Sequence, residues 1–544
     1  MSHWNRIFTG MVAGIVSALS IPSSATVILI DRPDIKVRDS ITNVEAVGRE
    51  CAVTVHPDDW KILLMSVISS TDNSCSEWVS TDGGISWKGD AVGDSSLLDS
   101  VGDPSVAILK GSPARYLVQG ISKDIGQHVA YTDSPTGLFT QQSVIIPGSE
   151  QSTDKGWLLA DNYSANRNLY SLWYHQGAGL WFRYSVNRGV SWIPLQPVPL
   201  RSDGVCWGGT LCVGIATSVL GHVYAAWPNY NTFSDPPINI TFKRSTSIPT
   251  FLPVGNGTVV TTYPGGSFDP HSDLPNSDNT NANSIPSMAA DDEGNIYIAW
   301  CEKRVGHGDA HVYVAKSTDN GSTWPSSPVE VTSSSDNQWL PWIAWDNDAK
   351  ALVAMFHDSR SNANTAEVYL AVSYDRGATF AELKVGDVPW SGNSDVGEYH
   401  GVAAGGGIAY PMWCDDRETT VKTFTSPTLI AGIESTSIVP TVTHHCAGTY
   451  TPRFNFKVDW TTLVNMDGTD KLTLTRPGGT QYIATANSTS NTHQLTISGL
   501  NCVNGTWTYQ VESNKGAGVS RSAAINVVIS CLTCPPCPPP CELD

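Results

Sequence analysis

The sequence predicts an all-β protein in which one small β unit is repeated along most of the chain and a second β domain follows. An eight-residue pattern recurs four times, short alternating apolar runs precede the copies, and no segment shows sustained helical periodicity. The 47 glycines and 33 prolines among 544 residues agree with many short strands joined by turns. A chain of this length can hold two or three domains.

The repeated pattern is Ser-x-Asp/Asn-x-Gly-x-Ser/Thr-aromatic. Its copies are Ser80–Trp87, Ser185–Trp192, Ser317–Trp324 and Ser373–Phe380. An Asp or Asn side chain can bond backbone amides two residues on, Gly adopts the positive φ of a reversal, and the Ser or Thr hydroxyl can close the loop onto the carboxylate. Each copy is therefore predicted to be a hairpin turn, with its aromatic side chain packed beside the next sheet.

Weaker copies extend the repeat at 131–139, 244–251 and 422–427, so that turns fall near residues 80, 132, 185, 245, 317, 373 and 425. An aromatic residue at the end of an inner strand marks the same phase at Trp173, Trp227, Trp300, Phe356 and Trp413. A spacing of about 50 to 70 residues corresponds to one four-stranded blade of a β-propeller. The spacing favours seven blades; six is the alternative if the first or last signal does not mark a full blade.

The octets resemble the Asp-box, or BNR, repeat of sialidase-like β-propellers over roughly residues 40 to 427. The resemblance implies that the Asp boxes are structural and lie away from the face that binds ligands. The early Arg-Ile-Pro motif of true sialidases is absent, because Arg32-Pro33 lacks the intervening residue and precedes the repeats. No catalytic residue is therefore carried over by motif, and the chain looks more like the exported BNR-repeat proteins.

The N-terminal segment and the net charge indicate where the protein acts and which ligands are excluded. Residues 1–25 have the form of a signal peptide, in which Arg6 precedes the mostly apolar stretch Ile7–Ile21; an uncleaved anchor is the alternative, although the stretch is short for a membrane span. No later segment is long and apolar enough to cross a membrane. The net charge of -19 argues against nucleic-acid binding. We therefore expect a secreted or cell-surface protein.

The domain plan places the propeller at 26–427, an immunoglobulin-like β-sandwich at 428–530 and a Cys/Pro-rich tail at 531–544. Alternating runs at 471–475, 493–498, 506–511 and 523–529 predict the strands of the sandwich.

Twelve cysteines fit an oxidising compartment. We expect the pairs Cys51–Cys75, Cys206–Cys212 and Cys446–Cys502, and assign no partner to Cys301 or Cys414. Six Asn-x-Ser/Thr triplets are consistent with a glycosylated surface, at Asn162, Asn239, Asn256, Asn320, Asn487 and Asn504.

The tail places Cys531, Cys534, Cys537 and Cys541 among prolines. Their spacing coincides with that of an iron–sulfur run, but proline cannot donate the amides that such clusters use. A stiff polyproline stretch that displays thiols to a second chain is favoured, which predicts a covalent homo-oligomer. The sequence predicts no cofactor and no metal ligand set.

Loops that lead into the first strand of a blade line the ligand-binding face of propellers. The candidates there are Asp103, Glu398 and Tyr399 as catalytic groups and Glu45, Asp154, Lys155, Trp157 and Trp339 as substrate-binding groups. Carboxylates and aromatic rings suit sugars, and a glycosidase needs two acids or a Tyr activated by a Glu. The alternative is that these polar groups cap strand ends around a solvated channel.

A second set of loops carries an aromatic-x-acid-x-Arg element that contains Arg304, Arg360 and Arg417. Three arginines on one face would suit a carboxylate ligand. The favoured alternative is a structural ion pair, since each arginine follows an acid by two residues.

Two classes of function remain open. The first is a secreted glycoside hydrolase, sialidase-like if it is an enzyme, that acts on extracellular glycans. The second is a non-catalytic glycan-binding or adhesive protein whose tail multiplies weak sites by avidity. The fold alone does not choose between them.

Overall fold

A computed structural model of the chain describes residues 33–70, 73–89, 100–122, 126–146, 153–175, 179–201, 206, 208–230, 239–247, 250–251, 257–262, 285–304, 308–391, 395–430, 433–443, 453–462, 466–501, 505–515, 518–521 and 525–529. These residues form two compact units, the first within 29–431 and the second from 432 onward apart from a short segment near 517. The expected signal peptide, the pair Cys446–Cys502 and the four tail cysteines lie outside the described residues. Among the described residues, no helix has the length and apolar character of a membrane span.

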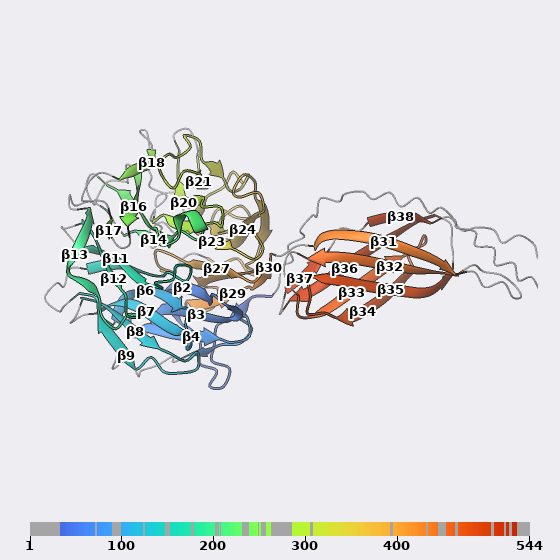
Figure 1. Cartoon of the computed structure of the whole chain (residues 1–544), viewed down its shortest axis with the longest axis horizontal. Helices are drawn as coiled ribbons and strands as arrows, with labels where there is room; N and C mark the ends of the chain where they lie inside the picture. The colour runs from blue at the N-terminus through green and yellow to red at the C-terminus, as the bar shows by residue number, and fades with distance from the viewer. Residues whose placement is uncertain are drawn as a thin grey trace, which may run out of the picture. The chain divides into compact units, whose positions relative to one another are not determined.

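The first unit is built from seven small antiparallel sheets in its described part (Figure 1). The first three are β2 (Gly48–His56), β3 (Asp59–Ser69), β4 (Cys75–Ser80) and β5 (Lys88–Gly89); β6 (Ser100–Leu109), β7 (Arg115–Ser122), β8 (Gly126–Thr132) and β9 (Gln141–Val144); and β10 (Thr153–Ala160), β11 (Leu169–His175), β12 (Gly179–Ser185) and β13 (Ile193–Arg201). The fourth contains β14 (Thr210–Val213), β15 (Val223–Asn229), β16 (Asn239–Ser247), β17 (Thr250–Phe251) and β18 (Thr258–Thr262), with a short 3-10 helix, η1 (Thr217–Val219), before β15.

The next two sheets are β19 (Ser287–Ala290), β20 (Ile296–Glu302), β21 (His311–Ser317) and β22 (Val329–Glu330); and β23 (Gln338–Asp346), β24 (Ala351–Asp358), β25 (Glu367–Ser373) and β26 (Ala381–Lys384). The last sheet contains β27 (Gly401–Gly405), β28 (Ile408–Asp415), β29 (Lys422–Thr425) and β30 (Thr428–Leu429). Since β30 pairs with β28, the first unit extends slightly beyond the expected boundary at 427.

The sheets close into a ring. Their first strands contact one another in the order β2, β6, β10, β14, β19, β23 and β27, and β27 contacts β2 again. The N-terminal strand β1 (Ile35–Lys36) pairs with β29, so the last sheet takes one strand from the other end of the chain (Figure 1). A closed ring of small antiparallel sheets is the architecture of a β-propeller.

The turn chemistry predicted from the octets is confirmed. In the first copy, Ser86 donates its amide to Asp82 Oδ1 at 2.9 Å and its hydroxyl to Asp82 Oδ2 at 2.5 Å, while Gly84 has a φ of +84°. Corresponding bonds close the copies around Asn187, Asp319 and Asp375. Each octet follows the third strand of its sheet, as the alternating runs predict.

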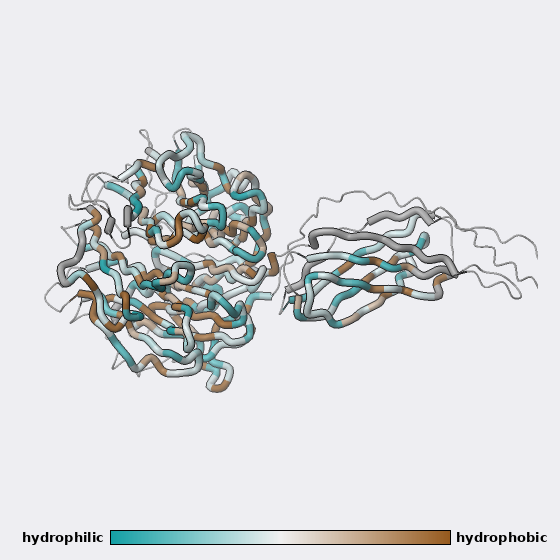
Figure 2. The backbone as a smooth tube through the Cα atoms, viewed as in Figure 1, coloured by the Kyte–Doolittle hydropathy of each residue, from teal (hydrophilic) through white to brown (hydrophobic). Residues whose placement is uncertain are grey.

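The hydrophobic core lies between adjacent sheets. One cluster combines Tyr297 and Val314 of one sheet with Leu352, Phe356 and Ala371 of the next, and all five side chains are buried. Figure 2 shows hydrophobic stretches within the strands of this unit. Burial of each large apolar side chain contributes about 1.5–3 kcal/mol, so inter-sheet packing dominates the stability of the ring.

The second unit is a β-sandwich. One sheet contains β31 (Ile433–Thr443), β32 (Arg453–Thr462) and β35 (Thr492–Asn501), and the other contains β33 (Thr469–Thr475), β34 (Gln481–Asn487), β36 (Gly505–Lys515), β37 (Gly518–Arg521) and β38 (Ile525–Ile529). Side chains of both sheets, among them Trp460, Leu472 and Trp507, form one buried cluster. The alternation of apolar and polar residues in β33 is the local cause, because it places Leu472 and Leu474 on the inner face.

Two of the expected disulfides are wrong. Cys51 in β2 and Cys75 in β4 flank β3, so two strand spacings, about 9.5 Å, separate them, which exceeds the reach of a disulfide. Cys206 pairs with Asn229 at one end of β15 and Cys212 pairs with Tyr224 near the other. Five residues of strand, about 17 Å, therefore separate the second pair.

Candidate functional site

Three neighbouring first strands carry the same irregularity. The pairing register shifts between Arg49 and Ala52 in β2, between Gly102 and Ser105 in β6, and between Asp154 and Trp157 in β10. Each bulge contains a residue with positive φ, namely Glu50 at 57°, Asp103 at 53° and Lys155 at 42°. Such conformations cost about 1–3 kcal/mol each, and a bulge re-aims the side chains of its strand.

The bulges bring their side chains together around one ammonium group. Lys155 Nζ lies 2.5 Å from Glu398 Oε2, 3.3 Å from Asp103 Oδ1 and 3.5 Å from Glu50 Oε1. The amide of Lys155 also donates to Asp103 Oδ2 at 2.8 Å. We call Glu50, Asp103, Asp154, Lys155 and Glu398 the carboxylate–lysine cluster.

The cluster has a buried base and a more accessible rim. The side chains of Lys155, Glu50 and Asp103 are 6%, 8% and 10% exposed. Glu398 and Asp154 are only partly buried. A ligand that approaches the cluster would therefore meet Asp154 and Glu398 first.

Burial and neighbouring charges shift the pKa values of Asp103, Asp154 and Glu50 in different directions. Burial lowers the pKa of Lys155, but Asp103, Glu50 and Glu398 outweigh it and raise that pKa well above the usual value. Burial raises the pKa of Asp103, yet Lys155 and hydrogen bonds hold it well below the ordinary range. Burial, aided by the charge of Asp103, raises the pKa of Asp154 to about 8, and burial also raises the pKa of Glu50. At neutral pH Asp154 is therefore a proton donor beside an ionised Asp103.

Three aromatic rings lie next to the cluster. The ring centroid of Trp157 is 4.8 Å from that of Trp342 and 6.1 Å from that of Tyr399. Lys155 Nζ lies 4.8 Å from the Tyr399 ring, a cation–π distance. Trp157 is partly exposed, so it offers a ring face beside the carboxyl groups.

Tyr399 does not have the surroundings of an activated nucleophile. Its hydroxyl donates to the Pro104 carbonyl at 2.8 Å, and burial together with the charges of Glu50 and Asp103 raises its pKa well above the usual value. The phenol is therefore kept neutral. These surroundings do not favour an attack by Tyr399 on a substrate, and a catalytic role for it stays a prediction.

Six of the expected site residues come together here: Asp103, Asp154, Lys155, Trp157, Glu398 and Tyr399. Sequence reasoning missed Glu50 and Trp342. Glu50 precedes the apolar run of its strand as Asp103 and Lys155 do, and Leu340-Pro341-Trp342 parallels Lys155-Gly156-Trp157, with Leu340 also at positive φ. Alignment of the first strands to one another would have found both.

Two other expected binding residues lie in separate contacts. Glu45 forms ion pairs with Lys36 at 3.0 Å and with Lys422 at 2.7 Å. Trp339 is 1% exposed and stacks on His357. Neither contacts the carboxylate–lysine cluster through any contact found among the described residues.

Arg304, Arg360 and Arg417 each form the structural ion pair that the sequence analysis gives as the favoured alternative. Arg360 pairs with Asp358 at 2.6 Å and covers the Tyr369 ring at 4.0 Å. Arg417 pairs with Asp415 at 2.5 Å and covers Phe424 at 4.2 Å. Arg304 repeats this arrangement with Glu302 and Tyr313. The same role in three sheets indicates a fold element rather than a carboxylate-binding site.

Comparisons with known proteins find similarity to solved structures only. No protein-family model and no curated protein matches it. A solved structure of a protein of unknown function from Dyadobacter fermentans is similar, with a TM-score of 0.43, 9% identity, and coverage of 74% of this chain and 99% of that one. An alpha-L-arabinofuranosidase of Fusarium graminearum has a TM-score of 0.37 and 12% identity, with coverage of 73% of this chain and 97% of that one. AofleA from Arthrobotrys oligospora has a TM-score of 0.37 and 10% identity, with coverage of 65% of this chain and 96% of that one. At these values the likeness assigns neither activity nor ligand, and the ring of sheets itself defines the class as a β-propeller.

Proposed function

We propose that this propeller is a glycoside hydrolase that acts on an extracellular glycan and that the carboxylate–lysine cluster is its active centre. The observation that carries the proposal is the presence of Asp154 and Glu398, both partly exposed, around the same buried Lys155 and near the partly exposed ring of Trp157. Hydrolysis of a glycosidic bond requires two carboxyl groups, one of which donates a proton, and the raised pKa of Asp154 suits that role.

Each residue has a role in this scheme. Asp154 donates a proton to the leaving oxygen, because burial, together with the charge and the hydrogen bond of Asp103, raises its pKa to about 8. Glu398 serves as the second carboxylate, positioned by Lys155. Trp157 stacks on a sugar ring.

The cluster is asymmetric around the ring, which favours one site. The bulges of β2, β6, β10 and β23 carry Glu50, Asp103, Lys155 and Leu340. A lectin that reads the same sugar in every sheet would repeat one residue set, whereas these four positions differ in charge and size.

The substrate is inferred to be neutral rather than a sialic acid. Arg304, Arg360 and Arg417 are each bound to an acid of their own strand end, so none of the three is available to a substrate carboxylate. This departs from the sialidase-like specificity that the Asp boxes suggest.

Non-catalytic glycan binding is the second candidate. The observation in its favour is the ion pair between Lys155 Nζ and Glu398 Oε2 at 2.5 Å, which already occupies this carboxylate. On this alternative the ring of Trp157 and the rim carboxyl groups would hold a sugar without cleaving it.

A panel of glycans, scored in one assay for binding and for released sugar, tests the proposal. Asp154→Asn and Glu398→Gln should each lower release at least 100-fold while binding persists, because acid or base catalysis contributes about 10²–10⁴-fold. The control is Glu45→Gln, which changes a carboxylate outside the cluster and should leave release intact. Binding without release by the unmodified protein would instead establish the lectin.

The same proposal places the protein outside the cell as a seven-bladed propeller followed by an immunoglobulin-like sandwich. The proposed blade number is supported by the presence of one sheet for each of the predicted turns. The proposed export is supported by the signal-peptide character of the N-terminal segment. Assembly through Cys531, Cys534, Cys537 and Cys541 stays a prediction. A single monomer band on a non-reducing gel of protein made in an oxidising compartment would refute that assembly.

A further inference from the structure

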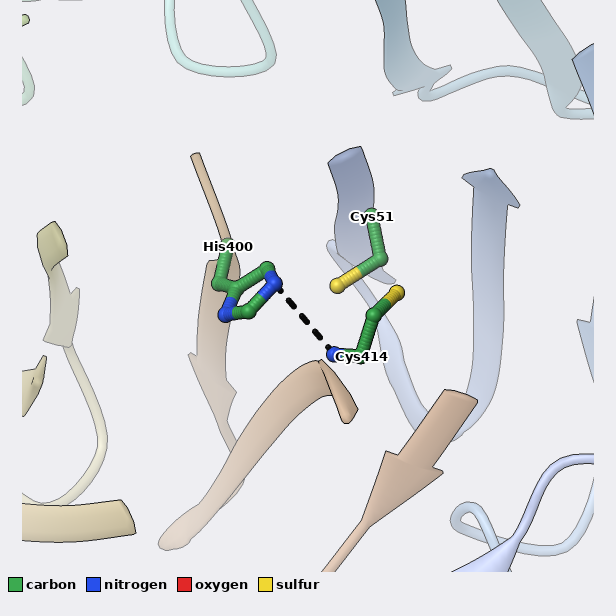
Figure 3. A group of neighbouring side chains, drawn as sticks. All are labelled: Cys51, His400 and Cys414. Atoms are coloured by element: carbon green, nitrogen blue, oxygen red, sulfur yellow. Dashed lines mark hydrogen bonds between the residues drawn. The ribbon is translucent and has the colours of Figure 1, made fainter. Parts of the chain in front are cut away.

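Two thiols and one imidazole converge at a place outside the carboxylate–lysine cluster. Cys51 lies in β2, His400 directly precedes β27, and Cys414 lies in β28. One ligand atom of each lies within 4.8 Å of the other two, and all three side chains are 0% exposed. Figure 3 shows both thiols and the imidazole turned toward one another.

The spacing of these atoms is close to that of a metal coordination sphere. A tetrahedral zinc ion with sulfur ligands at about 2.3 Å and a nitrogen ligand at about 2.0 Å holds neighbouring ligand atoms roughly 3.5–4 Å apart. The observed limit of 4.8 Å requires each group to move by less than about 1 Å. Two cysteines and one histidine are a donor set that zinc takes in proteins.

A second imidazole orients the first. His357 Nε2 lies 2.6 Å from His400 Nδ1, and both rings are buried. When His400 Nδ1 carries the proton and donates it to His357, the lone pair of His400 Nε2 faces Cys414, whose amide donates to it at 3.3 Å (Figure 3). Val396 O lies 3.2 Å from the same nitrogen and would accept a hydrogen bond from it only in the other tautomer. Metal-binding histidines commonly have their other nitrogen fixed in this way.

The three groups meet where the propeller closes. Cys51 belongs to the first sheet, whereas His400 and Cys414 belong to the last. We propose that Cys51, His400 and Cys414 bind a zinc ion, with water as the fourth ligand, and that the ion fastens the first sheet to the last. This inference is independent of the proposed glycosidase.

Metal content of the full chain, purified from zinc-supplemented medium, tests the site. Cys51→Ser and Cys414→Ser should each lose one zinc per chain relative to the unmodified protein. The matched control is Cys301→Ser: Cys301 also follows a Trp and precedes an acid, is 1% exposed, and bonds to Gln338 O at 3.1 Å in another sheet. Equal zinc in all four proteins would overturn the proposal.

Measurements on the unmodified protein guard against variants that fail to fold. Removal of zinc by a chelator should lower the unfolding temperature, and replacement by cobalt should produce a thiolate-to-cobalt absorption band. Thiol labelling in denaturant with chelator should modify Cys51 and Cys414 without a reductant. Labelling of these two only after reduction would show a disulfide between them and overturn the zinc site.

Discussion

At the scale of single residues, the charge state of each group in the carboxylate–lysine cluster depends on its neighbours. Lys155 stays charged because the carboxylates around it outweigh its burial, and Asp103 stays ionised because Lys155 and hydrogen bonds outweigh its own burial. Removal of one partner of a buried ion pair typically costs about 3–5 kcal/mol, since the other charge is left uncompensated. Burial, together with the charge of Asp103, raises the pKa of Asp154 to about 8, so that it keeps its proton at neutral pH.

The pH dependence of stability should reveal Asp154. Its pKa rises from 3.8 in the unfolded chain to about 8 in the fold. The stability that it contributes is therefore complete below pH 3.8 and is lost as the pH rises through 8. Denaturant unfolding of Asp154→Asn from pH 4 to 9 should show a flatter profile than that of the unmodified protein.

An acid with the opposite shift supplies the control. Arg115 lowers the pKa of Asp133, so Asp133→Asn should remove stability that is present above the unfolded pKa and lost on acidification.

If Asp154 is the proton donor, the rate of sugar release should be about tenfold lower at pH 9 than on the plateau at lower pH. A rate that is constant from pH 6 to 9 would argue against that role.

At the scale of elements, the turn of each octet was predictable because its chemistry is local. Asp319 receives the amide and the hydroxyl of Thr323 four residues away, and Ser317 bonds to both Asp319 and Gly321. Such contacts can be read from sequence spacing. The first-strand bulges were harder to predict, because Glu50 stands out only when the first strands are aligned to one another.

Gly321 tests how strongly the turn is specified. It has a φ of +77°, and an added Cβ would lie 2.0 Å from the Phe242 ring of the neighbouring sheet. Gly321→Ala should cost about 1–2 kcal/mol for the left-handed backbone and a further 1–3 kcal/mol for overpacking, as measured by denaturant unfolding. Gly308→Ala is the control, since nothing lies within 4 Å of its added Cβ. Equal stability of the two variants would contradict the packing described here.

At the scale of the whole molecule, sequence reasoning predicted a repeated ring but not how it closes. The repeats gave the sheets their order, because each carries its own turn signal. The pairing of Ile35 with Thr425 joins residues 390 positions apart and has no local signature. Cys51 and Cys414 are likewise far apart in the sequence, so their proximity has no local signature, and the sequence instead predicts a pair between Cys51 and the nearer Cys75.

Removal of β1 should therefore open the ring. Ile35 and Lys36 complete the last sheet, Lys36 Nζ lies 2.6 Å from Glu418, and Asp34 pairs with Arg417. A chain that lacks residues 1–38 leaves the edge of β29 unpaired and Arg417 with one acid fewer, so its unfolding temperature should fall by several degrees and limited proteolysis should cut first in the last sheet. A chain that lacks only residues 1–28 keeps these contacts and should match the full chain. If the two shortened chains unfold at the same temperature, the strand from the N-terminus contributes no measurable stability, and the ring is closed by the contacts of β2 with β27, β28 and β29.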